Sequence, residues 1–183
     1  MKHIRRISAF ILILALCLCF VSSASASSDG KFGSMRSSNT AQYSSTQAFM
    51  DAMDEKGIIY TYKGIDDDND EWLEIVYTGD YCDNIDIIVF FKADTQEANF
   101  RFWNMVDFNS ADYREVLTVV NQLNFDYKWV KFVVDTRDYS VQSEADVIFR
   151  PVDVGDICLE TLSHIVNVSD LAYHVLEPYV KQD

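Results

Sequence analysis

The sequence predicts an α+β domain in which an antiparallel sheet of five to six strands packs against helices. Three observations predict this fold class. Apolar residues recur every three to four positions in three segments, as expected of amphipathic helices. Between these segments apolar and polar residues alternate, which is typical of strands. Short turns join consecutive strands, so these strands must run antiparallel.

Residues 1–26 have the layout of a secretory signal peptide. Basic residues precede the apolar run Ala9–Val21, and small residues lead up to Ala26. The run is too short for a membrane span, which takes about 20 residues. We expect cleavage near Ala26, a secreted or extracytoplasmic protein, and no stable membrane insertion afterwards. Lipid attachment at Cys17 or Cys19 and retention of the segment as an anchor are the alternatives.

The remaining chain divides into a tether and a single domain. Residues 27–43 are rich in Ser and Gly and poor in apolar residues, so a flexible Ser-rich tether is expected there. Residues 44–183 have the length of one ordinary domain. Its first helix is expected over Ser45–Lys56, with Ser44 and Gln47 forming a capping box.

Strands and helices then alternate in the order α-β-β-β-(β)-α-β-β-α. The strands expected first are Ile58–Gly64, Glu71–Gly79 and Asp83–Asp94, followed by a fourth over residues 98–108. A second helix follows a cap at Asn109 or Ser110. Residues 127–135 and 139–149 predict a strand hairpin, and a long helix runs from Val154 to near Pro178.

The charge of the chain limits its partners. Residues 1–26 hold three of the 15 basic residues and none of the 29 acidic ones, so the rest carries a net charge of −17. Such a chain repels nucleic acid and anionic lipid, and neither is expected as a partner. Acidity also keeps a secreted protein soluble, which explains most of this charge.

The acidic run Asp66–Asp70 has two interpretations. Asp66, Asp68 and Asp70 alternate as calcium ligands do, but the sixth position of such a loop is Glu71 rather than Gly, and strands flank it. Asp and Asn also favour turns, because their side chains bond to the nearby backbone. A hairpin turn is the main prediction, and weak calcium binding is the alternative.

No motif indicates catalysis or a cofactor. The chain has no Gly-x-Ser-x-Gly sequence and no Gly-rich phosphate loop, so a non-enzymatic protein without a cofactor is expected. His164 and His174 are ten positions apart, a spacing that does not place them together as metal ligands. Cys82 and Cys158 are the two cysteines after Ala26, and a disulfide between them stays open because spacing cannot decide it.

Three tryptophans form the candidate binding site. Trp72, Trp103 and Trp129 each fall on the more polar side of a predicted strand. If the helices cover the other side, these residues gather on an open sheet face and mark a partner or self-association surface. The alternative is that the faces are assigned the wrong way round and the tryptophans belong to the core.

The segment Val119–Phe149 resembles the YbjN-like family. It carries an Asn-x-x-Asn helix end, here Asn121 and Asn124, followed by a strand hairpin and a long helix. The segment "GIIYTYKGIDDDNDEWLEI" is similar to the family's first hairpin. The resemblance covers about Ser45 to Tyr179 and implies a fold like that of type III secretion chaperones, which bind other proteins and are commonly dimers. It implies no enzyme activity.

We therefore expect a secreted, non-enzymatic protein-binding or chaperone-like module, with a protein partner or a second copy of itself as the ligand. An envelope protein that binds a small ligand or calcium is the alternative.

Overall fold

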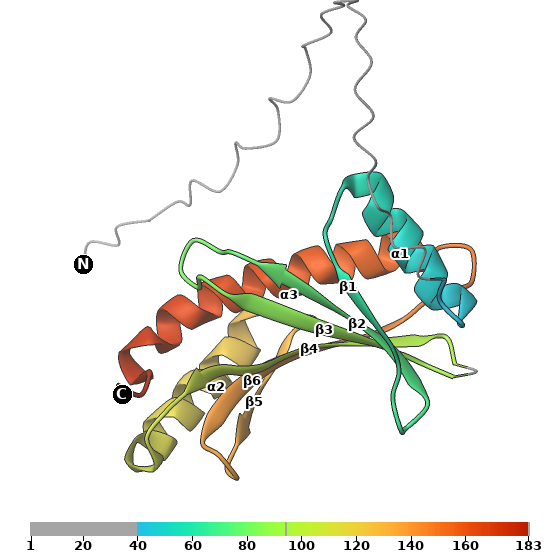
Figure 1. The fold of residues 1–183 in the computed structure, drawn as a ribbon. Helices are drawn as coiled ribbons and strands as arrows, with labels where there is room; N and C mark the ends of the chain where they lie inside the picture. Colours follow the sequence, from blue (N-terminus) through green and yellow to red (C-terminus); the bar gives the residue numbers. More distant parts are fainter. Residues whose placement is uncertain (1–39, 94, 183) are drawn as a thin grey trace, which may run out of the picture. The chain divides into compact units, whose positions relative to one another are not determined.

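The computed structural model describes residues 40–93 and 95–182, and its elements follow the predicted order (Figure 1). The first half contains helix α1 (Ser44–Lys56) and strands β1 (Thr61–Ile65), β2 (Asp70–Tyr77), β3 (Ile85–Lys92) and β4 (Glu97–Asp107). The second half contains η1 (Ser110–Asp112), α2 (Tyr113–Asp126), β5 (Lys131–Asp135), β6 (Ser140–Ile148), α3 (Val154–Leu176) and η2 (Glu177–Tyr179). The predicted signal peptide and most of the predicted tether lie outside the described residues.

The six strands form one antiparallel sheet in the order β1-β2-β3-β4-β6-β5. This confirms the predicted α+β class and its strand number. Because β6 inserts between β4 and β5, the second hairpin joins the sheet through its later strand. No helix in the described part of the chain is both long and apolar enough to cross a membrane.

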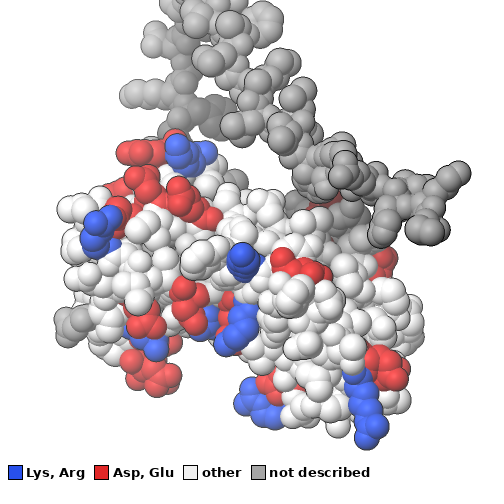
Figure 2. All heavy atoms as spheres, turned by 180° about the vertical axis from the view of Figure 1, so that it is seen from behind, with Lys and Arg blue, Asp and Glu red and all other residues white. Residues whose placement is uncertain are grey.

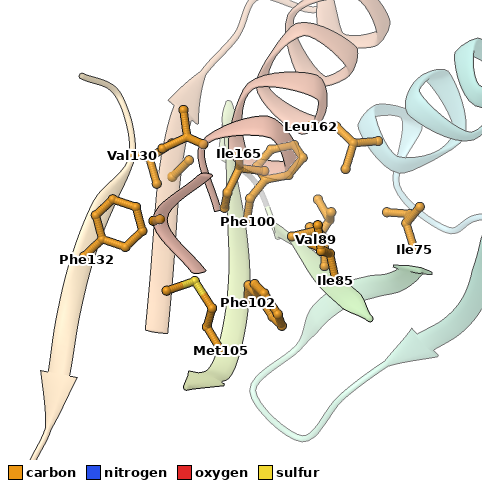
Figure 3. Packing of buried hydrophobic residues seen from close by; sticks show 14 of the residues in the cluster. Ile75, Ile85, Val89, Phe100, Phe102, Met105, Val130, Phe132, Leu162 and Ile165 are labelled. Carbon is orange, nitrogen blue, oxygen red and sulfur yellow. The ribbon is translucent and has the colours of Figure 1, made fainter. Parts of the chain in front are cut away.

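The core lies between one face of this sheet and the helices. Figure 3 shows Leu162 and Ile165 of α3 directed toward sheet residues such as Phe100 and Val89. Phe49 of α1 adds ring contacts, with its centroid 5.8 Å from that of Phe91 and 6.1 Å from that of Phe100. Burial of such side chains from water is the main stabilising contribution to the fold.

The start of α1 differs from the predicted capping box. Tyr43 occupies the N-cap position and no side chain caps the helix. Gln47 instead accepts a hydrogen bond from the Ala41 backbone N–H through Oε1 at 3.0 Å. The capping prediction is wrong because a carboxylate from a distant strand, Glu71, occupies the space before the helix.

Glu71 is a fully buried carboxylate at the start of β2. It accepts hydrogen bonds from the backbone N–H groups of Gln42 at 2.6 Å and Tyr43 at 2.8 Å, and from the Tyr62 hydroxyl. Burial raises the pKa of Glu71, but these hydrogen bonds outweigh it and hold the pKa below its ordinary value. Glu71 therefore ties the segment before α1 to the sheet as an anion.

Asp170, in the C-terminal half of α3, is a second buried carboxylate that binds backbone N–H groups. Its carboxylate accepts backbone N–H bonds from Asp80 at 3.0 Å, Tyr81 at 3.0 Å and Cys82 at 2.8 Å. Burial raises the pKa of Asp170, but the three hydrogen bonds lower it by more, so the pKa lies below its ordinary value. The loop between β2 and β3 is thereby wrapped around one side chain of α3.

The close approach of the β2–β3 loop to the Asp170 carboxylate requires glycine at position 79. Replacing Gly79 tests how much these contacts stabilise the fold. A Cβ atom at Gly79 would lie 2.1 Å from Oδ1 of Asp170. We expect Gly79→Ala to lower the free energy of unfolding by about 2–3 kcal/mol, because Asp170 must move and lose its bonds. Gly57→Ala is the control. Gly57 has a φ of 69° with no atom within 4 Å of its Cβ position, so only backbone strain of about 1 kcal/mol is expected. Equal decreases in the free energy of unfolding for Gly79→Ala and Gly57→Ala, measured by urea denaturation, would contradict a stabilising role of the contacts between this loop and Asp170.

Glu71 makes the fold sensitive to acid. Its pKa in the folded state lies below the unfolded value of about 4.3, so its stabilisation is complete above that pH and is lost as the pH falls through the folded pKa. We expect Glu71→Gln to lower the free energy of unfolding by about 3 kcal/mol at pH 7. The difference from the native chain should shrink as the pH falls below about 4 and through the lowered pKa of Glu71.

The control for this experiment is Glu74→Gln, on the other face of the same strand. Glu74 forms a surface ion pair with Lys63 at 2.7 Å, so its loss should cost less than about 1 kcal/mol. Urea denaturation across the pH range measures both variants. A Glu71→Gln deficit that stays constant with pH would show that the charge is not what stabilises this site.

Candidate functional site

The second face of the sheet carries a row of aromatic side chains. The ring centroids of Trp72 and Phe90 are 6.0 Å apart and their planes nearly parallel, and the centroids of Phe90 and Trp103 are 5.7 Å apart. Trp72 and Phe90 are partly buried, and Trp103 is 45% exposed. We call Trp72, Phe90 and Trp103 the aromatic row. It lies across β2, β3 and β4, and such exposed rings are typical of binding surfaces.

Paired charges surround the aromatic row. Arg101 and Asp146 are 2.7 Å apart, Lys131 and Glu144 are 2.6 Å apart, and the Lys63 ammonium lies 5.7 Å from the Trp72 ring centroid. Figure 2 shows acidic and basic side chains interspersed over one side of the molecule rather than gathered in a single block. In each of the two ion pairs one side chain is at least half exposed and its partner is largely buried.

One carboxylate on this face has an enclosed oxygen atom. Asp86 in β3 is partly buried, and its Oδ1 atom has no hydrogen bond within the described part of the chain. Burial and the neighbouring carboxylate of Glu74 raise the pKa of Asp86. A buried acceptor without a donor is destabilising, so this enclosed oxygen costs the fold some stability and is not a hydrogen-bond acceptor offered at the surface.

The structure brings together two of the three predicted tryptophans. Trp72 and Trp103 share the open face, as expected, and Phe90 joins them. The prediction that Trp129 sits on a strand beside them is wrong, because β5 begins only at Lys131. Trp129 has a φ of 71° and is 84% exposed. For a bulky side chain this left-handed backbone costs about 1–2 kcal/mol, and it ends the extended conformation.

The sequence pattern does not assign Phe90 to the open face. It lies in the run Ile87–Phe91, where every residue is apolar, so the alternation gives no sign of which side faces the helices. The core alternative also fails for Trp103 and Trp129, because both are exposed. The role of these tryptophans in binding stays a prediction.

The acidic run Asp66–Asp70 forms a hairpin turn between β1 and β2. Asp66 Oδ1 accepts backbone N–H bonds from Asp68 at 3.0 Å and Asp70 at 2.9 Å, and Asn69 has a φ of 65°. These contacts explain the composition of the run as turn chemistry. In the described residues no three His, Cys, Asp or Glu side chains are grouped as a metal site, so nothing supports the calcium alternative.

The two cysteines are separate buried thiols. The Cys82 backbone is bonded to Asp170, whereas Cys158 lies twelve positions before Asp170 on the same helix, about 18 Å along its axis. Disulfide-bonded residues have Cα atoms within about 7 Å of each other, so this fold does not allow the pair to bond. Burial raises the pKa of both thiols, and that of Cys158 to about 12.

The histidines serve local contacts. His164 is hydrogen-bonded to the Lys128 carbonyl at 2.8 Å, and His174 stacks on Tyr81 with ring centroids 4.2 Å apart. These contacts place the two histidines at different sites, as their spacing predicts.

Comparison with known proteins adds one finding about the fold. A chain in the crystal structure of the ExsC-ExsE complex superimposes with a TM-score of 0.51 at 10% sequence identity, over 75% of this chain and 97% of that chain. The fold is thus type III secretion chaperone-like, as predicted. No protein family profile matches the sequence, and no curated protein matches it. The similarity therefore supports the chaperone-like fold, while the YbjN-like resemblance stays a prediction.

The exposure of the tryptophans can be measured directly. We expect acrylamide quenching to be strongest for Trp129, weaker for Trp103 and weakest for Trp72, because stacking shields the last ring most. Three variants, each retaining one Trp and carrying Phe at the other two positions, separate the signals. Urea-unfolded samples provide the control, since all three should then quench alike. Equal quenching of Trp72 and Trp129 in the folded state would contradict the aromatic row.

Proposed function

We propose that this protein is a secreted, non-enzymatic module that binds another protein through the open face of its sheet. The observation that carries the proposal is the aromatic row, in which neighbouring large rings on the open sheet face remain partly in water. Contiguous exposed apolar patches often mark protein interaction sites.

Two further points support the proposal. The paired charges around the row give a polar rim of the kind that surrounds protein interfaces. The solved structure with the similar fold is itself a complex of two proteins.

Secretion and membership of the YbjN-like family also belong to the proposal. Both rest on the sequence, the first on the signal-peptide pattern of residues 1–26 and the second on the resemblance over Val119–Phe149. Partners should therefore be sought outside the cytoplasm.

The test is capture of partners by the tagged mature chain from envelope and secreted fractions of the source cell. We expect one stoichiometric protein, retained by the native chain and lost with Trp103→Ser. Trp103 is exposed, so this variant should keep its melting temperature within a few degrees. Phe125→Ser is the matched control, because Phe125 is an 80% exposed aromatic on α2, away from the sheet face.

Each other outcome has a definite meaning. Equal loss with Trp103→Ser and Phe125→Ser would show non-specific adhesion and contradict the proposal. Capture of the native chain itself, with a dimer in sedimentation that Trp103→Ser dissociates, would assign the face to self-association. Binding unaffected by Trp103→Ser would place the interface elsewhere.

A further inference from the structure

The sheet has a second unpaired feature at the end of β6. Strand β5 pairs only with Ser140–Glu144, whereas β6 continues to Ile148 and remains paired with β4 on its other side. Residues Ala145–Ile148 therefore have a neighbour on one side only in the described part of the chain. We call this segment the free edge.

The direction of the backbone groups along β6 follows from a contact of the neighbouring strand. The Asn124 side chain accepts from the Phe132 N–H at 2.8 Å and donates to the Phe132 carbonyl at 2.9 Å. Both groups of Phe132 thus face away from β6. In an antiparallel pair these directions alternate residue by residue. The backbone groups of Asp146 and Ile148 consequently face the free edge.

Asn124 occupies one position of the neighbouring edge, whereas no described residue does so on the free edge. By bonding both groups of Phe132, it blocks one of the outward-facing positions that an added strand would use on β5, and the groups of Val134 face outward as well. No described residue forms the equivalent bonds with Asp146 or Ile148. A row of unpaired N–H and C=O groups is a template for an added strand.

Side chains around the free edge form two hollows that share Trp129 and Asp146. The smaller, of about 210 Å³, is also lined by Ala145, Val147 and His164, and the larger, of about 680 Å³, extends along Lys131. Trp129 has a strained left-handed backbone and its side chain is 84% exposed, so burial of this ring adds little to the stability of the fold. Strain of this kind is concentrated at ligand-binding sites.

The charges at the free edge indicate what would bind. Glu160 lines the smaller hollow and Lys128 the larger one, and neither forms an ion pair with the described residues. The exposed Trp129 face attracts cations. The chain after Ala26 carries a net charge of −17, which disfavours a second copy of itself and favours a basic partner.

We propose that the free edge of β6 binds an extended segment of a partner protein as an added strand, with Lys or Arg alternating with apolar residues in that segment. The added strand would bond to the N–H and C=O groups of Asp146 and Ile148. Its basic side chains would meet Trp129 and Glu160. This inference rests on the proposed protein-binding function but concerns a surface separate from the aromatic row.

The test uses a synthetic peptide with the mature chain. The probe is fluorescein-labelled Val-Lys-Val-Lys-Val-Lys with an amidated end, and anisotropy measures binding. We expect saturable binding that weakens at least tenfold with Ile148→Pro, which removes one outward donor and no bond to β4. Trp129→Asn should also weaken it tenfold while leaving the melting temperature equal or higher, because Asn tolerates the left-handed backbone.

Matched peptides separate the contributions. The same sequence with Glu in place of Lys should bind at least tenfold more weakly, and equal binding would overturn the basic assignment. A probe with N-methylated valines, which cannot donate, should not bind. Trp103→Ser should leave peptide affinity unchanged, so failure here and failure of the proposed function can be told apart.

Other occupants would overturn the proposal in recognisable ways. A dimer that Ile148→Pro dissociates would assign the free edge to a second copy. Slow hydrogen exchange at Asp146 and Ile148 in the mature chain alone would assign it to the chain's own segment before Thr40. Absence of peptide binding, or binding indifferent to both Ile148→Pro and Trp129→Asn, would exclude strand addition by a basic segment.

Discussion

Burial of a single sheet face beneath α3 and α1 is the constraint on which the other features depend. A helix that lies across several strands gains apolar contacts along its length but needs its ends fixed. Asp170 fixes one end through three backbone N–H groups, and Glu71 fixes the segment that leads into α1. Both carboxylates are buried, so their charge is tolerated only because each oxygen is hydrogen-bonded. The long-range contacts of the fold therefore depend on two ionised side chains.

The same one-sided covering determines the chemistry of the rest of the surface. The open face must be compatible with water, and the ion pairs of β4, β5 and β6 serve that purpose. The open face nevertheless carries the aromatic row, whose rings contact one another, at positions where polar residues would be more compatible with water. The edges also differ, since Asn124 bonds both backbone groups of Phe132 in β5, while the end of β6 has no such partner among the described residues. Both departures occur where partner recognition is proposed.

The sequence was sufficient for the periodic part of this structure. Alternation and helical spacing predicted all six strands and the three α-helices, because burial of one side leaves that signal in the residue order. It was not sufficient for Glu71 and Asp170, whose backbone partners lie 28 to 29 and 88 to 90 positions away along the chain. It also misplaced Trp129, since a left-handed residue interrupts a strand without any change in apolar pattern. Asn124 was noticed only through a family resemblance, which gave no sign of its role.

The two buried thiols have a consequence for the chain if it is secreted as proposed. Each stays protonated near neutral pH because burial raises its pKa, and a protonated thiol reacts slowly with oxidants and disulfides. Folding alone thus protects both sulfurs in an oxidising compartment. Once the chain opens, the sulfurs can form a cross-link that the native spacing cannot accommodate, and the molecule is then trapped outside its fold. The accessibility of the two thiols therefore distinguishes molecules that have stayed folded from those that have unfolded and been oxidised.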